Sequence, residues 1–104
     1  MAKITVRMYT ILKENVGTGS VNLAVKNAGE ALEKLKERFG GQFVDTLYED
    51  DGKKIKGYFI LLLNGKVVDR VNPSRHKLKN GDTLHIFPPI AGGKQRGQPL
   101  LRNQ

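Results

Sequence analysis

The sequence contains no cysteine among its 104 residues. A disulfide framework, a thiolate metal site and a cysteine nucleophile are therefore all excluded. A single domain of this length needs no such staple, because it can bury roughly two-thirds of its unfolded surface. The absence of cysteine is compatible with the reducing cytoplasm, which is where we expect the protein to be located.

Long hydrophobic runs are also missing. The longest, at residues 58–63, has the length of a strand and falls far short of the roughly 20 residues of a membrane-spanning helix. The chain opens directly on an alternating pattern and lacks the apolar core of a signal peptide. We therefore expect no association with a membrane.

Side chains for catalysis or metal binding are few. His76 and His85 are the only histidines, and neither has a carboxylate or a second histidine at ligand spacing, so we expect no metal site. The neighbouring Asp50 and Asp51 belong to a polar loop, where nothing would shift their pKa values for acid–base chemistry. No glycine pattern typical of a phosphate-binding loop is present. We expect no catalytic residue and no bound cofactor.

The formal net charge is +8, from 18 basic and 10 acidic residues. Such a balance is compatible with a nucleic acid or an acidic protein as a partner, and also with a solvated basic surface that only promotes solubility. However, the basic residues are scattered, and the seven aromatic residues fall mostly at core positions, so a base-stacking platform is not indicated. A basic RNA-binding module is kept as the least favoured alternative.

Hydrophobic periodicity defines the first half of the chain. Residues 3–12 and 20–25 alternate between apolar and polar residues, which predicts two half-buried strands. The glycine-bearing turn at residues 17–19 would join them into an antiparallel hairpin. Asn27 and Glu30 then have the spacing of a capping box, and an apolar stripe with helical spacing follows up to Phe39. A second, shorter helix is predicted over residues 42–49.

The second half contains the remaining strands. The nearly continuous apolar run at 58–63 predicts a central strand covered on both faces. Asn64-Gly65 predicts a hairpin that leads to a short returning strand at 66–69, and residues 83–87 form the last strand. The result is an α+β domain at residues 1–87. One main helix packed across a mixed sheet of about five strands, with the last strand beside the first, is the β-grasp arrangement.

After Phe87 the periodicity stops. Pro88 and Pro89 cannot donate to a strand ladder and favour an extended, stiffened chain. We expect residues 88–93 to form a flexible functional tail that ends in a diglycine. Residues 94–104 have a polar, glycine- and glutamine-bearing composition that favours disorder. We treat them as an extension of the tail.

The segment from Gly81-Asp82 to the diglycine resembles the C-terminus of the MoaD/ThiS-type ubiquitin-like sulfur carriers. This family comprises the molybdopterin synthase small subunit, the archaeal small modifier proteins and, more distantly, the thiamine sulfur carrier. The residues that match the family tail position by position are Phe87, Pro88, Pro89, Ile90, Ala91, Gly92 and Gly93. A diglycine alone would be weak evidence, but this order of residues after a final strand is specific.

The resemblance implies a carrier protein that is not itself an enzyme. A ubiquitin-activating-type adenylating enzyme would use ATP to convert the Gly93 carboxylate to an acyl-adenylate and then to a thiocarboxylate. The sulfur would serve molybdenum- or tungsten-cofactor synthesis in the large subunit of molybdopterin synthase. Alternatively, Gly93 would be conjugated to lysines of target proteins.

Physical arguments favour such a tail independently. Ala91 and Gly92 have little or no side chain and can pass through a narrow channel. The six residue steps from Phe87 to Gly93 reach about 20 Å at roughly 3.3 Å each. The partner-docking residues are expected to be Phe87, Pro88, Pro89 and Ile90. Leu62 is expected mainly in the core.

The extension distinguishes this chain from the family pattern, in which carriers end at the second glycine. While Lys94 is attached, Gly93 has an amide in place of a carboxylate and cannot be adenylated. Three explanations stay open: a protease removes the extension by cleavage between Gly93 and Lys94, the extension is permanent and the carrier chemistry is lost, or the extension is artificial. Cleavage before function is the favoured hypothesis.

Overall fold

The computed structural model describes residues 1–88. The predicted tail from Pro89 onward and the extension lie outside these residues. The elements, in chain order, are β1 (Ala2–Met8), α1 (Thr10–Val16), β2 (Ser20–Val25), α2 (Ala28–Phe39), α3 (Gly41–Leu47), β3 (Ile60–Leu63), β4 (Lys66–Val67), the short 3-10 helix η1 (Pro73–Arg75) and β5 (Thr83–Phe87). No helix of this described part is long and apolar enough to span a membrane.

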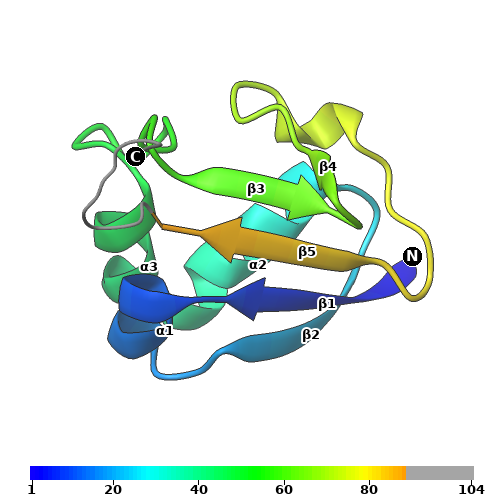
Figure 1. Ribbon diagram of the computed structural model, residues 1–104, viewed down its shortest axis with the longest axis horizontal. Coiled ribbons are helices and arrows are strands. Elements are labelled where there is room, and N and C mark those ends of the chain that lie inside the picture. The colour runs from blue at the N-terminus through cyan, green and yellow to red at the C-terminus, as the bar shows by residue number, and fades with distance from the viewer. Residues whose placement is uncertain (89–104) are drawn as a thin grey trace, which may run out of the picture.

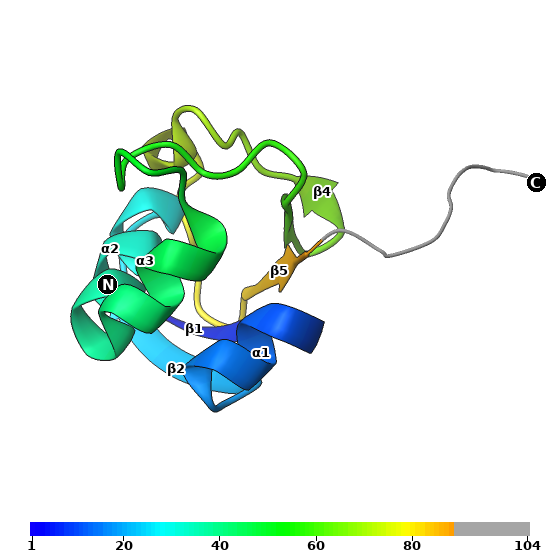
Figure 2. The same ribbon diagram turned by 90° about the vertical axis from the view of Figure 1, so that its left-hand side faces the viewer.

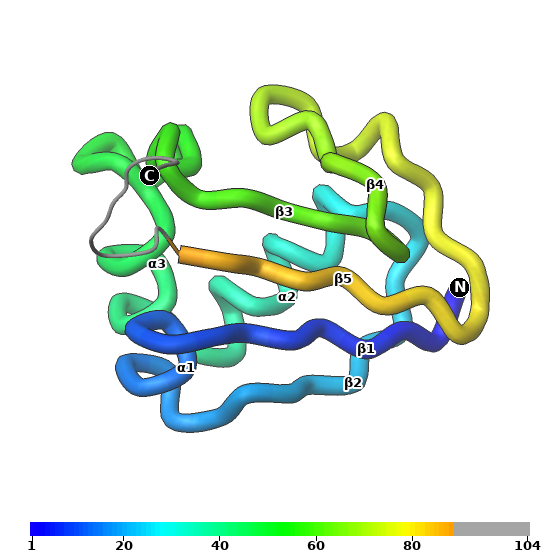
Figure 3. Tube along the Cα trace, viewed as in Figure 1, coloured from blue at the N-terminus to red at the C-terminus, as the bar shows by residue number. Residues whose placement is uncertain are grey.

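The strands form one mixed sheet in the order β2-β1-β5-β3-β4. The first and last strands, β1 and β5, lie side by side and parallel at its centre (Figure 3). All other pairs are antiparallel. Helix α2 lies across one face of the sheet, and no helix of residues 1–88 covers the opposite face (Figures 1 and 2). The predicted α+β class and β-grasp arrangement are confirmed.

The predicted first hairpin is only partly correct. Strands β1 and β2 pair antiparallel as expected, but helix α1 takes the place of a short loop between them. The predicted strand is too long because its alternation continues past Met8, the last residue of β1, and masks the four-residue spacing of Leu12 and Val16 in α1. The chain turns at Thr10, whose φ is 47°, and Leu12 then becomes fully buried.

Helix α2 begins where the sequence predicts. The side chain of Asn27 accepts a hydrogen bond from the Glu30 amide at 2.8 Å, which satisfies one of the free amides of the first turn. The Glu30 carboxylate reaches back to the Lys26 amide, also at 2.8 Å, one residue before the position of a capping box. The helix ends at Gly40, whose φ of 63° favours glycine. The predicted second helix is confirmed as α3.

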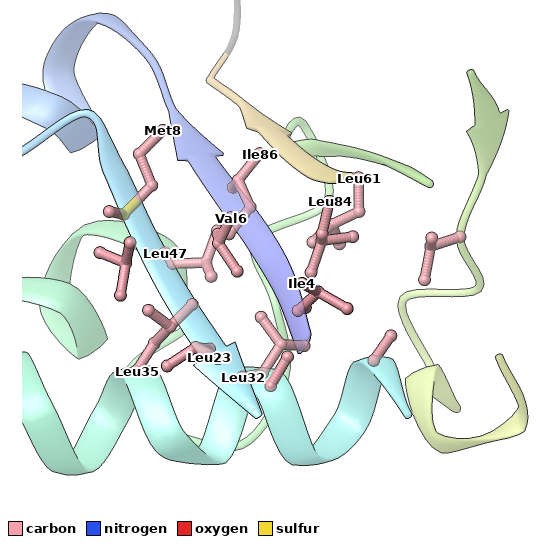
Figure 4. Close-up of a cluster of buried hydrophobic side chains, with 14 of the residues drawn as sticks. Ile4, Val6, Met8, Leu23, Leu32, Leu35, Leu47, Leu61, Leu84 and Ile86 are labelled. Carbon is pink, nitrogen blue, oxygen red and sulfur yellow. The ribbon is translucent and has the colours of Figure 1, made fainter. Parts of the chain in front are cut away.

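The hydrophobic core lies between the sheet and the helices (Figure 4). It takes alternate residues of the strands and the inner faces of the helices. The labelled members are Ile4, Val6, Met8, Leu23, Leu32, Leu35, Leu47, Leu61, Leu84 and Ile86. Leu84 and Ile86 are fully buried, as the alternation of residues 83–87 predicts, and their burial holds β5 against the helical layer.

The prediction of a strand covered on both faces is wrong. Strand β3 lies between β5 and the short edge strand β4, and the helices cover only one of its faces. Leu61 is buried, whereas Ile60 is 50% exposed and Leu62 is half-buried. A continuous apolar run does not distinguish a doubly covered strand from one that leaves apolar side chains on an open face.

Candidate functional site: the open sheet face beside the last strand

Strand β5 orients the residues nearest the predicted tail. Its neighbours fix the register, with Ile86 opposite Met8 of β1 and Phe87 opposite Ile60 of β3. Ile86 is fully buried on the helical side. Since side chains alternate along a strand, His85 and Phe87 must point to the open face. A slip of one residue would expose Ile86, so burial of Ile86 holds this orientation.

Three rings stack on the open face at the end of β5. The ring of Tyr9, just after β1, lies 4.5 Å from that of Phe87 between centroids, with the planes 8° apart. The Tyr9 ring also stacks on His85 at 5.9 Å. The Tyr9 hydroxyl lies 2.7 Å from Nδ1 of His85, within hydrogen-bond distance. The stack therefore joins β1 to β5 and holds Phe87 in place.

Apolar side chains of β3 and β4 continue this surface. Ile60 is paired with Phe87 across the strands, Leu62 with His85, and Val67 with Leu62. Cross-strand partners point to the same face, so these side chains extend the aromatic stack toward the sheet edge. Ile60 is 50% exposed and Val67 is 72% exposed. We call this surface the exit patch; its members are Tyr9, Ile60, Leu62, Val67, His85 and Phe87.

The opposite end of β5 is fixed by a polar cluster. The buried Asp82 accepts hydrogen bonds from the Lys79 amide and from Nδ2 of Asn64, each at 2.8 Å. These two bonds, the Lys79 amide first, lower the pKa of the Asp82 carboxyl group. Oδ1 of Asn64 accepts in turn from the Thr83 amide at 3.0 Å. The Asn64-Gly65 turn is therefore tied to the first residue of β5.

The structure places two of the residues predicted for the site. Phe87 is half-buried within the exit patch, and Pro88, the last described residue, is buried. The other predicted site residues lie outside the described part of the chain: Pro89, Ile90, Ala91, Gly92, Gly93 and Lys94. The sequence prediction does not include Tyr9 in the site. The alternation of residues 3–12 places Tyr9 on the same outward face as Arg7, and this pattern is the signal that could have identified it.

The exit patch offers apolar and stacking contacts for a partner. Elsewhere in residues 1–88, no three side chains of the metal-binding types gather. The second histidine, His76, accepts a hydrogen bond from the Asp69 amide through Nε2 at 2.9 Å, so it supports the loop after β4. The side chains of the exit patch therefore suit binding of a partner surface beside the end of β5.

Known proteins are similar to this chain over most of its length. Small archaeal modifier protein 3 of Haloferax volcanii is 29% identical over 94 residues, which cover 88% of this chain and 99% of that protein. The solved structure of small archaeal modifier protein 1 of the same organism matches with a TM-score of 0.75 at 24% identity, covering 88% of this chain and all of that one. This likeness concerns the fold.

A chain of the BexX/CysO complex of Amycolatopsis orientalis matches with a TM-score of 0.68 at 27% identity, over 86% of this chain and 99% of that one. The model of the ThiS family matches residues 6–93. The match thus begins within β1, includes the other four strands of the sheet and ends at the second glycine of the predicted tail. By the extent of that match, the chain belongs to the ThiS family.

Proposed function

We propose that the protein is a ubiquitin-like sulfur carrier that acts at Gly93 once residues 94–104 have been removed. A partner adenylating enzyme activates the Gly93 carboxylate with ATP, and the resulting thiocarboxylate donates its sulfur in molybdopterin synthesis within the large synthase subunit. In this proposal the chain itself is not the catalyst. It supplies a docking surface and an acyl group, and the nucleotide site belongs to the partner.

The observation that carries the proposal is the position of the exit patch. The patch surrounds the last residue of β5, which is the strand that leads into the family tail. A partner that covers Tyr9, Ile60 and Phe87 therefore lies next to the point where the tail begins. Five residue steps from Pro88 to Gly93 can reach about 16 Å at roughly 3.3 Å each, enough to bring Gly93 into the active site of that partner.

Adenylation of Gly93 requires that residues 94–104 be removed first. Hydrolysis of the Gly93–Lys94 amide yields a carboxylate on Gly93. That carboxylate attacks the α-phosphorus of ATP, releases pyrophosphate and forms an acyl-adenylate. Hydrosulfide then attacks the acyl carbon, AMP leaves, and a thiocarboxylate results. Small residues at positions 91–93 fit this sequence of steps, because a narrow channel can exclude water from the reactive acyl-adenylate.

The test compares a chain truncated after Gly93 with the full chain. Each is incubated with its adenylating enzyme, ATP and sulfide, and the intact mass is measured. We expect the truncated chain to exchange one oxygen for sulfur and the full chain to stay unchanged. If the truncated chain keeps its mass in the presence of active enzyme, the carrier function is refuted. Intact mass of the protein from its source checks removal of residues 94–104.

A second candidate function is that of a protein modifier conjugated to lysines through Gly93. It is supported by the name of the curated relative, small archaeal modifier protein 3, which is similar over nearly its full length. The same adenylate would be attacked by a lysine amine in place of hydrosulfide, giving an isopeptide bond. Because Lys79 is the last lysine or arginine before Gly93, trypsin digestion of whole-cell protein followed by mass spectrometry would reveal residues 80–93 attached to lysines of target proteins if this function holds.

A further inference from the structure

A second surface lies at the end of the sheet opposite the exit patch. It is formed by four exposed lysines, Lys3, Lys26, Lys77 and Lys79, which we call the basic pole. The last three line a shallow hollow of about 450 Å³, together with Leu78 and Asn80 and the first two residues of the chain. Figure 1 shows this end of the molecule, where the start of β1 meets the loop that leads into β5.

Backbone contacts hold the four lysines in one place. The Gly81 amide donates to the Lys3 carbonyl at 2.9 Å, and the Lys3 amide donates to Oδ1 of Asn80 at 2.8 Å. The Leu78 amide donates to the Lys26 carbonyl at 3.0 Å. Lys77 forms a β-bridge with the residue after Lys26. The basic pole is therefore built on a rigid junction of three chain segments.

Within residues 1–88, no carboxylate forms an ion pair with a lysine of this surface. The three ion pairs of the described chain involve Lys34, Lys36 and Arg75, none of which belongs to the basic pole. Two carboxylates adjoin it: Glu30 and Asp82 accept hydrogen bonds from the backbone amides of Lys26 and Lys79, and Asp82 is also attracted by the charge of Lys79. The three lysines that line the hollow carry three positive charges against these two, and Lys3 adds a fourth beside them.

The other end of the molecule is nearly balanced in charge. Helices α1 and α3 and the loop after α3 carry five acidic residues, Glu14, Asp45, Glu49, Asp50 and Asp51, and four basic ones, Lys13, Lys53, Lys54 and Lys56. The basic pole thus has a larger excess of positive charge than this end of the molecule. Complementarity of potential is a general determinant of which surfaces associate and how fast they do so.

We propose that the basic pole docks an acidic surface of a partner protein. Because the pole and the exit patch lie at opposite ends of β5, a partner at the pole leaves the tail accessible to a second protein. A nucleic acid is the less favoured ligand, because binding of single strands relies on aromatic stacking platforms. None of the aromatic residues in the described part of the chain lines the hollow, and the stacked Tyr9 and Phe87 lie at the other end of the sheet.

The test uses the full chain and a fluorescent decaglutamate peptide as the acidic probe. Fluorescence anisotropy at low salt compares the double variant Lys77→Glu/Lys79→Glu with the control Lys53→Glu/Lys54→Glu. Both variants change the net charge equally, and all four side chains are exposed. We expect the pole variant to bind the peptide at least about tenfold more weakly and the control to change much less, since exposed charge pairs act mainly at short range.

Two results would overturn this inference. Equal loss of peptide binding in both variants would mean that net charge alone attracts the probe. Tighter binding of decauridylate than of decaglutamate would mean that the pole is a nucleic-acid surface. The inference does not depend on sulfur transfer. The pole variant truncated after Gly93 is expected to gain sulfur at the unaltered rate, and a failure of the unsubstituted truncated chain to gain sulfur would count only against the carrier function.

Discussion

At the scale of single residues, Gly29 shows how closely α2 approaches the loop before β5. A Cβ atom added at Gly29 would lie 2.1 Å from Oγ of Ser74 and 3.0 Å from its amide nitrogen. The serine hydroxyl can rotate away, but the backbone nitrogen cannot. No alternative side chain is therefore small enough for this position in the first turn of α2.

We expect Gly29→Ala to lower the free energy of unfolding by roughly 1 to 3 kcal/mol, the usual cost of overpacking. Gly41→Ala in α3 is the matched control, because its Cβ would meet no atom closer than 4.0 Å. The control should be neutral or up to about 1 kcal/mol more stable, since alanine favours helices over glycine. Urea denaturation measures both; equal stability of the two variants would contradict the packing argument.

Asp82 gives stability a dependence on pH. Its folded pKa is lowered by hydrogen bonds from the Lys79 amide and Asn64, so the unfolded state binds the proton more readily. The carboxylate therefore stabilises the fold above its ordinary pKa of 3.8, and this contribution is lost as the pH falls through the lowered value.

The variant Asp82→Asn should lose about 1 kcal/mol at neutral pH, the net worth of a hydrogen bond. It should also lose less additional stability than the unsubstituted protein on acidification. Chemical denaturation at about pH 7 and about pH 3 provides the comparison, on the two sides of the ordinary aspartate pKa. A variant whose stability falls with pH as steeply as that of the parent would show that Asp82 is not the responsible group.

At the scale of elements, α1 is the main difference between this structure and the β-hairpin that the sequence predicts for the first two strands. The helix occupies the connection between β1 and β2 and packs against α3. One side chain, Leu12, anchors it in the core at 0% exposure, whereas the neighbouring Ile11 is 46% exposed. The two adjacent positions thus provide an internal comparison.

Leu12→Ala should therefore destabilise the protein by roughly 2 to 5 kcal/mol, as expected for a cavity in a packed core. Ile11→Ala should cost less than about 1 kcal/mol, in the range of a surface substitution. Thermal unfolding monitored by circular dichroism distinguishes the two. Comparable losses would indicate that α1 contributes through its surface and not through Leu12.

Most of the elements could be predicted from the sequence because their local signals agree. The cap at Asn27, the apolar stripe and Gly40 all place α2 correctly, and Asn64-Gly65 places the β3–β4 turn. Helix α1 could not be predicted, because it is short and depends on the positive φ of Thr10 and on the burial of Leu12 by distant segments. For β3, the apolar run was read correctly as a strand but its environment was not.

Like α1, the candidate site depends on contacts between distant segments of the chain. The outward phases of Tyr9 and His85 can be read from their strands, but their stacking depends on the parallel pairing of β1 with β5. No local pattern encodes a contact between residues so far apart in the chain. The family tail, in contrast, could be recognised from the order of its residues alone, although it lies mostly outside the described part of the chain.

At the scale of the whole molecule, exposed valines on different sides offer a test of the exit patch. Val67 belongs to the patch at 72% exposure, and Val71, at 94% exposure, lines a groove beside α2. The two residues have the same chemistry and similar solvation. Replacement of either by glutamate should change stability by no more than about 0.5 kcal/mol.

We expect Val67→Glu to raise the adenylating enzyme's KM for this chain about tenfold, because docking would desolvate the new carboxylate at an apolar interface. Val71→Glu should leave the KM unchanged. Pyrophosphate release from the chain truncated after Gly93 provides the assay. If both variants behave like the parent, the partner approaches from another side.

The central position of β5 has a mechanical consequence. An enzyme that holds the C-terminus and pulls on it applies tension along a strand that is bonded on both sides, to β1 and to β3. Both ladders are then loaded in shear, and their hydrogen bonds must fail together instead of opening one after another. Tension on the C-terminal end of β5 therefore meets the combined resistance of two ladders before the sheet can open.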